Sequence, residues 1–399
     1  MPWENLLDVA GLGTIARMVG LLLAATWFSA VVLGARVRRP SAFHAVVLVF
    51  FLWNAATLFW TVDLDSTLTS VFTYVQLLGL VAIIWDLYET PEDVRAALQA
   101  YVLGSYISVS SLVANYLAEN AGPSHSRMLH VTSANYSEMG FYVNDLGFIL
   151  VLGIPMAWYL ALGKSRSRSA NALKLINYLY VPAAVVGVVL TESRAAFLGM
   201  LPAALFILGS VKRLKIHQRI LLCGALVAAL VLAAPFVPEA SVERLATTGS
   251  EMEGGDINGR MRIWRAGISA FNERPLVGFG TGAFRTAVTC RNAEGQGCFA
   301  HNFIILFLVE DGLVGSAIFA LILVLLFRYA WRQPKWESRL WLAMLAMWLI
   351  GATSHNWEQR KQTWLLFNLV VISAGMPVCS GFLASEGRLA VGQLSEAEA

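Results

Sequence analysis

The longest polar interval in a chain otherwise built of apolar runs begins with NGRMRIWRAGISAFNERPLVGFGTGAFR, residues 258–285, and ends with HNFIILFLVEDGLVG, residues 301–315. The interval combines several glycines with arginines at positions 260, 262, 265, 274 and 285. Guanidinium groups bind phosphate oxygens through paired hydrogen bonds, so such a cluster favours an anionic ligand. Because His301 leads directly into an apolar run, the sequence predicts that this ligand is bound at a membrane surface and is linked to a lipid.

The composition is that of a membrane protein. Hydrophobic residues make up 57% of the chain and charged residues 14%, against about 25% charged residues in soluble domains. Apolar runs of about 17 to 25 residues are long enough to span a bilayer as helices. They occur at 18–35, 42–60, 67–85, 98–118, 140–162, 175–191, 195–211, 217–235, 302–327, 339–353 and 364–383. The sequence therefore predicts an all-α polytopic membrane protein with about eleven transmembrane helices.

The positive charges indicate how these helices are oriented. Lys and Arg cluster after the first, fifth, seventh and ninth predicted spans, and short loops rich in these residues lie on the cytoplasmic side. This alternation puts the N-terminus outside and the C-terminus inside. It divides the chain into N-terminal transmembrane helices (1–235), a large external loop (236–300), C-terminal transmembrane helices (301–383) and a cytoplasmic tail (384–399) that we expect to be disordered.

Arg194 is the first candidate for chemistry, because it lies in a brief TESR segment between two apolar runs, at a predicted tight turn. A charged residue at such a depth is costly to bury and is usually functional. Its guanidinium can grip phosphate oxygens bidentately. The alternative is a local ion pair with Glu192, or a side chain that extends to the membrane interface.

Arg260 is the second candidate. It precedes residues 261–272, where apolar residues recur at helical spacing and predict an amphipathic helix on the outer membrane surface. The N-terminus of such a helix offers free amides and a positive dipole end to an anion. Arg265 and Arg285 belong to the same loop and are predicted to bind substrate, although a salt bridge is the commoner role of any single arginine there.

His301 and His355 both stand in His-Asn pairs at predicted outer helix ends. An imidazole with an unperturbed pKa near 6.5 suits proton transfer at neutral pH. His301 could serve in this role or donate a hydrogen bond to phosphate, but the residues alone favour a capping or interfacial histidine. His355 is a weaker candidate, for which we expect a substrate-binding role. Asp145 lies inside a predicted span, where we expect it to face a substrate cavity.

Other polar residues are assigned structural roles. Glu310 and Asp311 fall within the predicted span 302–327, where we expect them to pair with a neighbouring helix. Cys290 and Cys298 enclose a short external loop and are candidates for a disulfide in an oxidising compartment. No further His or Cys has the spacing of a zinc site, so no metal is expected.

Four segments of the sequence resemble the O-antigen ligase and polymerase superfamily of bacterial inner-membrane proteins. They are SRAAF (193–197), GRMRIW (259–264), ERPLVGFGTGAF (273–284) and HNFIILFLVEDGLVG (301–315). Each motif is weak alone, but their order, spacing and predicted sidedness make the resemblance specific. The chain departs from the family in having Ala195 where Gly is more common, and in having eleven predicted spans where twelve is usual.

The resemblance implies about a dozen helices, one large periplasmic loop containing amphipathic helices, and an active site on the periplasmic side of the bacterial inner membrane. It implies a metal-independent glycosyltransferase without a cofactor, in which Arg194, Arg260 and His301 are catalytic. The implied donor is a glycan on undecaprenyl pyrophosphate. The acceptor is lipid A-core for a ligase, or a second lipid-linked glycan for a polymerase of O-antigen or exopolysaccharide. Membrane lipid is an expected partner and nucleic acid is not.

The main alternative is a flippase or exporter of lipid-linked oligosaccharides. Transporters commonly contain two related halves with interrupted helices, whereas these motifs occupy one half and no internal repeat is evident. A non-catalytic assembly subunit is a third possibility, and it would tolerate substitution of Arg194 and His301. The sequence favours the enzyme without deciding between ligase and polymerase.

Overall fold

The computed structural model describes residues 8–9, 13–34, 36–120, 143–163, 168–191, 193–211, 260–289 and 297–376, together with scattered residues between 214 and 231. Within these residues the fold is all-α, apart from two-residue strands β1 (Asp8–Val9) and β2 (Gly13–Thr14), which pair antiparallel. The predicted fold class is thus confirmed. By length and composition, five described helices can cross a membrane: Ala42–Phe59, Leu64–Leu87, Pro91–Ala114, Ser169–Thr191 and Gly312–Trp331.

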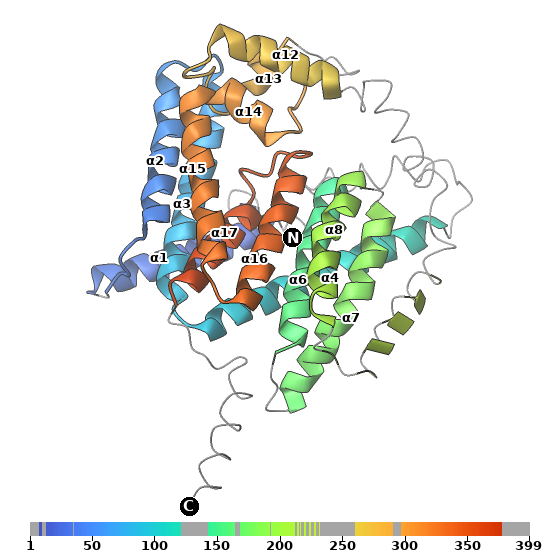
Figure 1. Cartoon of the computed structure of the whole chain (residues 1–399). Helices are drawn as coiled ribbons and strands as arrows, with labels where there is room; N and C mark the ends of the chain where they lie inside the picture. The colour runs from blue at the N-terminus through green and yellow to red at the C-terminus, as the bar shows by residue number, and fades with distance from the viewer. Residues whose placement is uncertain are drawn as a thin grey trace, which may run out of the picture.

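The described helices form two groups that are joined mainly by one helix and also by a smaller direct contact (Figure 1). The first group contains α2 (Ala42–Ala56), α3 (Leu64–Leu87), α15 (Gly312–Trp331) and α17 (Lys361–Ala374), with α1 (Ile15–Val32) against α3 and the short η1 (Thr57–Phe59) after α2. The second contains α4 (Pro91–Asn120), α6 (Val143–Ala161), α7 (Arg168–Thr191) and α8 (Arg194–Leu208). Helix α16 (Lys335–Ala352) packs against α15 and also against α6 and α8.

Close packing of large rings against small residues holds the two groups together. Lipid tails are as apolar as the helices, so membrane helices associate through packing rather than through a hydrophobic driving force. The ring of Phe148 on α6 is fully buried between Gly199 of α8 and Gly351 of α16. A Cβ at Gly351 would lie 2.6 Å from that ring, so a larger residue there would push α16 away from α6.

Three short helices form a cap across one end of the long helices (Figure 1). They are α12 (Arg260–Glu273), α13 (Phe284–Ala287) and α14 (Phe303–Glu310). Helix α12 confirms the amphipathic helix predicted over 261–272, and it packs on α14 through the buried Gly267. A Cβ there would lie 2.8 Å from Ile305, so glycine permits the close approach of the two helices.

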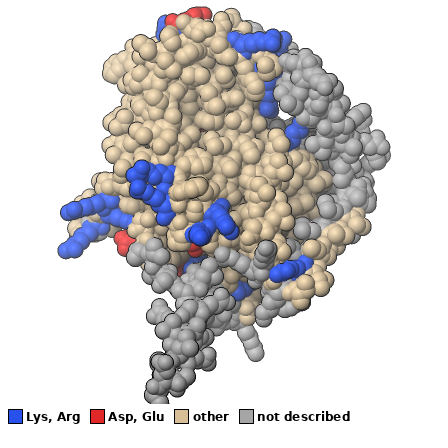
Figure 2. Space-filling model, viewed as in Figure 1, with Lys and Arg blue, Asp and Glu red and all other residues tan. Residues whose placement is uncertain are grey.

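The charged side chains are concentrated towards the two ends of the helices. Most of the surface visible between the cap and the opposite end carries no charge (Figure 2). Helix α15 leads away from the cap for 16 residues, about 24 Å, before Arg328 in its last turn, and Arg332 follows the helix. An uncharged band of this height spans most of the hydrocarbon core of a bilayer, which is about 30 Å thick.

The predicted continuous span over 302–327 is wrong. Helix α14 ends at Glu310, and Gly312 begins α15 with a φ of +64°. Because the residues on both sides of this junction are apolar, the hydropathy pattern continues through the break and does not reveal it. The predicted pairing of Glu310 and Asp311 with a neighbouring helix holds only in part. Glu310 binds the N–H of Phe284 at the start of α13, but it also binds Gly282, and Asp311 binds Thr281, both in the glycine-rich turn that follows α12.

Residues 275–284 and 309–314 together form what we call the clasp. The backbone N–H groups of Phe279 and Gly280 donate to the carbonyls of Val309 and Glu310, at 2.9 and 2.8 Å. The carboxylate of Glu310 accepts hydrogen bonds from the N–H groups of Gly282, at 2.8 Å, and Phe284, at 3.1 Å. These bonds satisfy carbonyls at the end of α14 that have no partner within the helix. The clasp therefore fixes the cap on the long helices.

Candidate functional site

Arg194, Arg260 and His301 lie close together, although they come from distant parts of the sequence. Arg194 is the first residue of α8 and Arg260 the first of α12, and His301 stands just before α14. The charge of Arg194 contributes to lowering the pKa of Arg260, and the charge of Arg260 contributes to lowering that of His301. The N-terminal ends of helices carry partial positive charge, so this meeting of three helix starts favours an anion.

Trp264 links the face of α12 that carries Arg260 to the segment before His301. It lies four residues after Arg260 and hence on the same face of α12. Its indole N–H donates to the carbonyl of Ala300 at 2.9 Å, which ties the residue before His301 to this face. Burial and then the charge of Arg194 lower the pKa of Arg260, and no described acidic side chain forms an ion pair with it.

His301 has an unusual backbone. Its φ of 47° is the only positive value at a non-glycine residue in the described part of the chain. Such a conformation costs about 1 to 3 kcal/mol and is found mainly at functional sites. Capping of α14 falls to Asn302, whose side-chain oxygen accepts from the N–H groups of Ile304 and Ile305. The strained backbone of His301 is therefore not explained by helix capping.

The protonation of His301 follows from its surroundings. Burial is the main cause that lowers its pKa, and the charge of Arg260 lowers it further, to about 4. The nearby carboxylate of Asp145 opposes this shift but does not outweigh it. The imidazole is consequently neutral at pH 7 and is able to accept a proton.

The other side of the site comes from α6 and from the connection between α16 and α17. The carboxylate of Asp145 lies 2.6 Å from the guanidinium of Arg360 and accepts a hydrogen bond from the indole N–H of Trp357 at 2.9 Å. His355 interacts electrostatically with Asp145, Arg260 and Arg360. Its buried Nε2 has no hydrogen-bond partner among the described residues, and buried polar atoms rarely lack one. A substrate oxygen is one partner that would satisfy it.

Sequence reasoning missed Arg360 and Trp357. Asp145 was assigned to a substrate cavity, but both of its oxygens are engaged by these two residues and its side chain is only 6% exposed. The sequence did contain a signal for this pair. A carboxylate within a membrane span needs a partner, and Arg360 is a cation in the same connection as His355. What the sequence could not supply is the packing of α6 beside this connection, 215 residues away in the chain.

The remaining predicted site residues lie elsewhere. Arg265 is exposed on α12, about 140° around the helix from Arg260. Arg285 lines a separate cavity, described below. Cys298 is disulfide-bonded, whereas Cys290 lies outside the described residues, so their pairing stays a prediction. Glu192, the predicted local partner of Arg194, also lies outside them.

The arrangement is suited to holding an anion next to a proton acceptor. Three arginines, at positions 194, 260 and 360, outnumber the carboxylate of Asp145 and that of Glu358, which interacts electrostatically with Arg360 and Asp145. The described residues contain no group of three or more His, Cys, Asp or Glu side chains placed to hold a metal ion. In a site of this kind, fixed positive charge stabilises negative charge that develops on a substrate.

Comparison with known proteins finds a family that resembles part of the chain. A family model described as O-antigen ligase matches residues 179–320, a region that contains Arg194, Arg260, His301 and the whole clasp. No curated protein matches the chain. The family match supports glycan transfer of the ligase or polymerase type in general, and hence an enzyme resembling a glycosyltransferase. Residues 179–320, which contain all four motifs named from the sequence, are thus similar to the O-antigen ligase family.

Proposed function

We propose that the protein transfers a glycan from undecaprenyl pyrophosphate to an acceptor hydroxyl, at the periplasmic face of the bacterial inner membrane and without a metal ion. The observation that carries this proposal is the like-charged pair of Arg194 and Arg260 beside a neutral His301. Two guanidiniums held close together repel one another, and a pyrophosphate would convert that repulsion into attraction to both. The site is therefore complementary to a leaving group with several negative charges.

The chemistry requires a leaving group and a proton acceptor. The acceptor oxygen attacks the anomeric carbon of the donor sugar while the bond from that carbon to the pyrophosphate oxygen breaks. The electron pair of the broken bond stays on the pyrophosphate, where Arg194 and Arg260 stabilise the new charge. The proton of the acceptor hydroxyl passes to the neutral ring of His301. Attack opposite to the leaving group inverts the configuration at the sugar.

Binding of the donor would make His301 a better base. Burial and Arg260 hold its pKa at about 4, at which it accepts a proton only weakly. A bound pyrophosphate offsets the charge of Arg260 and adds negative charge of its own, and both effects raise the pKa of an imidazole. Proton transfer is thereby linked to the presence of the leaving group.

The acceptor is lipid A-core if the protein is a ligase, and a second lipid-linked glycan if it is a polymerase. Both acceptors present a sugar hydroxyl, and the site around His301 and His355 acts on a hydroxyl in the same way in either case. The acceptor must therefore be identified by experiment, with both molecules offered separately to the purified protein.

The test is a transfer assay with purified protein, undecaprenyl-pyrophosphate-linked glycan and each acceptor, in the presence of EDTA. We expect wild-type transfer with inversion, and a loss in kcat of at least about 100-fold in Arg194→Gln and in His301→Gln. Arg328→Gln is the matched control, because it removes an exposed arginine from the opposite end of α15. It should retain activity within about twofold.

Two results would overturn the proposal. Transfer that persists in Arg194→Gln and His301→Gln would remove both residues from the chemistry. If wild type glycosylates neither acceptor but moves intact lipid-linked glycan across liposome membranes, the protein is a flippase. Dependence of transfer on added divalent metal would contradict the metal-free mechanism alone.

A further inference from the structure

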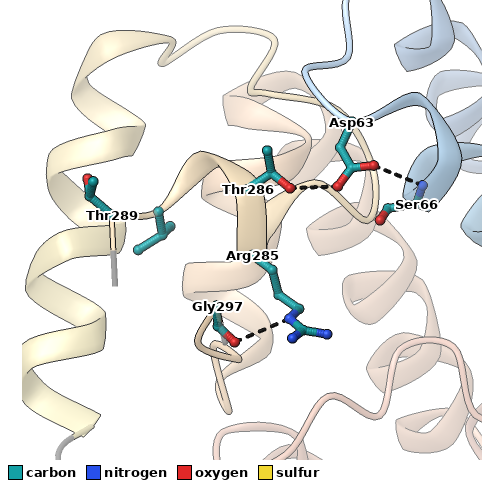
Figure 3. A pocket seen from close by; sticks show the side chains of 7 residues that line it. Asp63, Ser66, Arg285, Thr286, Thr289 and Gly297 are labelled. Carbon is teal, nitrogen blue, oxygen red and sulfur yellow. Dashed lines mark hydrogen bonds between the residues drawn. The ribbon is translucent and has the colours of Figure 1, made fainter. Parts of the chain in front are cut away.

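A polar cavity lies beside the cap and shares no lining residue with the cluster of Arg194, Arg260 and His301. Its volume is about 550 Å³, within the range of about 300 to 1,000 Å³ that is usual for ligand pockets. Its walls come from the connection between α2 and α3, from α13 and from the segment before His301. The polar lining residues are Asp63, Ser66, Arg285, Thr286 and Thr289, with the backbone of Gly297 (Figure 3).

Asp63 supplies a fixed acceptor to this cavity. One oxygen of its carboxylate accepts from the N–H of Ser66 at 3.1 Å, and the other accepts from the hydroxyl of Thr286 at 2.6 Å. The bond from Thr286, followed by those from Ser66, holds the pKa of Asp63 below its ordinary value. A carboxylate has about four acceptor sites, so these two contacts leave capacity for a ligand.

Arg285 supplies fixed donors to the same cavity. Its Nε donates to the carbonyl of Gly297 at 3.2 Å (Figure 3). Its guanidinium carbon lies 4.7 Å from the centre of the Phe299 ring. These contacts orient the guanidinium while its terminal nitrogens keep their donors. No described carboxylate lies within ion-pair distance of Arg285, so those donors are available to a ligand.

A carbohydrate matches this combination better than an ion does. Sugar hydroxyls both donate and accept hydrogen bonds, so different hydroxyls of one glycan can satisfy Asp63 and Arg285. Asp63 would repel a phosphate, and Arg285 would repel a metal cation. We propose that the cavity binds sugar residues of a glycan substrate, which deepens and rests on the function proposed above.

The cavity is near enough to the reacting centre to hold the same molecule. Gly297 precedes His301 by four residues, and a chain spans at most about 3.6 Å per residue. The Cα atoms of Gly297 and His301 are therefore at most about 14 Å apart. A glycan that reacts beside His301 can reach the cavity with its next sugar residues, so the cavity would select the glycan without taking part in the chemistry.

The experiment uses the full chain and two separate measurements. The first is calorimetric binding of the free oligosaccharide that mild acid cleaves from the lipid-linked donor. The second is glycan transfer, with KM determined for donor and acceptor in turn. The variants are Arg285→Gln and Asp63→Asn, since asparagine preserves the capping of α3 while it removes the charge.

Arg274→Gln is the matched control. Arg274 is an exposed arginine of the same loop, it also donates to a backbone carbonyl, and its guanidinium carbon lies 4.9 Å from the centre of the Phe279 ring. It does not line the cavity. The two substitutions therefore remove the same charge and a similar cation–π contact, and they differ in their access to the cavity.

We expect Arg285→Gln and Asp63→Asn to weaken oligosaccharide binding about tenfold and Arg274→Gln to leave it unchanged. The KM of one glycan substrate should rise while kcat is preserved, and that substrate, donor or acceptor, is the one that the cavity holds. Binding equal to that of wild type in both variants would overturn the proposal even if transfer occurs. Binding that depends on Arg285 in a protein without transfer activity would support the cavity and refute the proposed function.

Discussion

The cluster around His301 and the clasp are held by opposite kinds of interaction. In the clasp, backbone N–H groups meet carbonyls and the carboxylate of Glu310, so buried polar groups are paired. In the cluster, Arg194 and Arg260 repel one another, His301 has a strained backbone, and Nε2 of His355 lacks a partner among the described residues. The two regions are connected in sequence at His301, which lies between the two segments of the clasp.

The contrast separates structure from function. Unfavourable local features persist only where the surrounding fold imposes them, and they concentrate where they serve a ligand or a reaction. The clasp provides the rigid support, because it fixes α14 and thereby His301, which lies just before the N-cap of that helix. In the cluster, the charge of Arg194 is close enough to lower the pKa of Arg260, an arrangement that a bound anion would stabilise. Changes in the clasp should therefore affect stability, and changes in the cluster should affect activity.

Arg260→Gln should produce the largest effect on activity. Loss of one fixed positive charge from a leaving-group site lowers kcat about 100- to 1,000-fold, by analogy with removal of one oxyanion-hole donor. The melting temperature should stay constant or rise, because the substitution also removes the repulsion of Arg194. Glycan transfer and thermal unfolding in detergent measure the two quantities. A fall in both together would mean that Arg260 holds the fold rather than the leaving group.

Gly278→Ala should produce the largest effect on stability. Gly278 has a φ of +69°, and a Cβ there would lie 2.3 Å from the carbonyl oxygen of Glu310. Left-handed backbone and steric overlap together should lower the free energy of unfolding by more than about 2 kcal/mol. Gly79→Ala is the control, since a Cβ in that position of α3 meets no atom within 4 Å. Equal melting temperatures for the two variants would show that the fold does not depend on the close approach of Gly278 to Glu310.

Acid should destabilise the cluster by a smaller amount. The pKa of His301 is about 4 in the folded protein and about 6.5 when unfolded, so the unfolded state binds more protons between these values. Stability must therefore fall as the pH is lowered through this window, by about 1 to 2 kcal/mol between pH 7 and pH 5. His301→Gln should remove this part of the decrease. A histidine NMR signal that titrates near pH 6.5 in the folded wild type would contradict the assignment.

The sequence predicted the parts of the site that local patterns encode. The spacing of Ile263, Trp264 and Gly267 predicted α12, and the resemblance to known motifs selected Arg194, Arg260 and His301, which the fold brings together. Their catalytic role stays a prediction. The clasp also joins two of the quoted motifs, but hydrogen bonds between backbone groups leave no pattern in a single sequence.

Long-range packing accounts for what could not be predicted. The break between α14 and α15 depends on the φ of Gly312, while the hydropathy continues through it. The contact of Arg360 with Asp145 depends on how α6 lies against the end of α16, and neither segment specifies this alone. The cavity at Arg285 likewise forms only where α13 meets the connection between α2 and α3.

Arg265→Gln should have the smallest effect, and it sharpens the comparison most directly. Arg265 and Arg260 lie on the same helix, and substitution by glutamine removes one positive charge from either. Arg265, however, is exposed and points about 140° away from Arg260 around the axis of α12. If total positive charge attracted the anionic donor, both variants would raise KM to a similar extent. If placement at the helix start matters, Arg265→Gln should keep kcat and KM within about twofold of wild type. Kinetics at two salt concentrations decide between these cases, because screening weakens long-range attraction and leaves direct contact with the pyrophosphate largely intact.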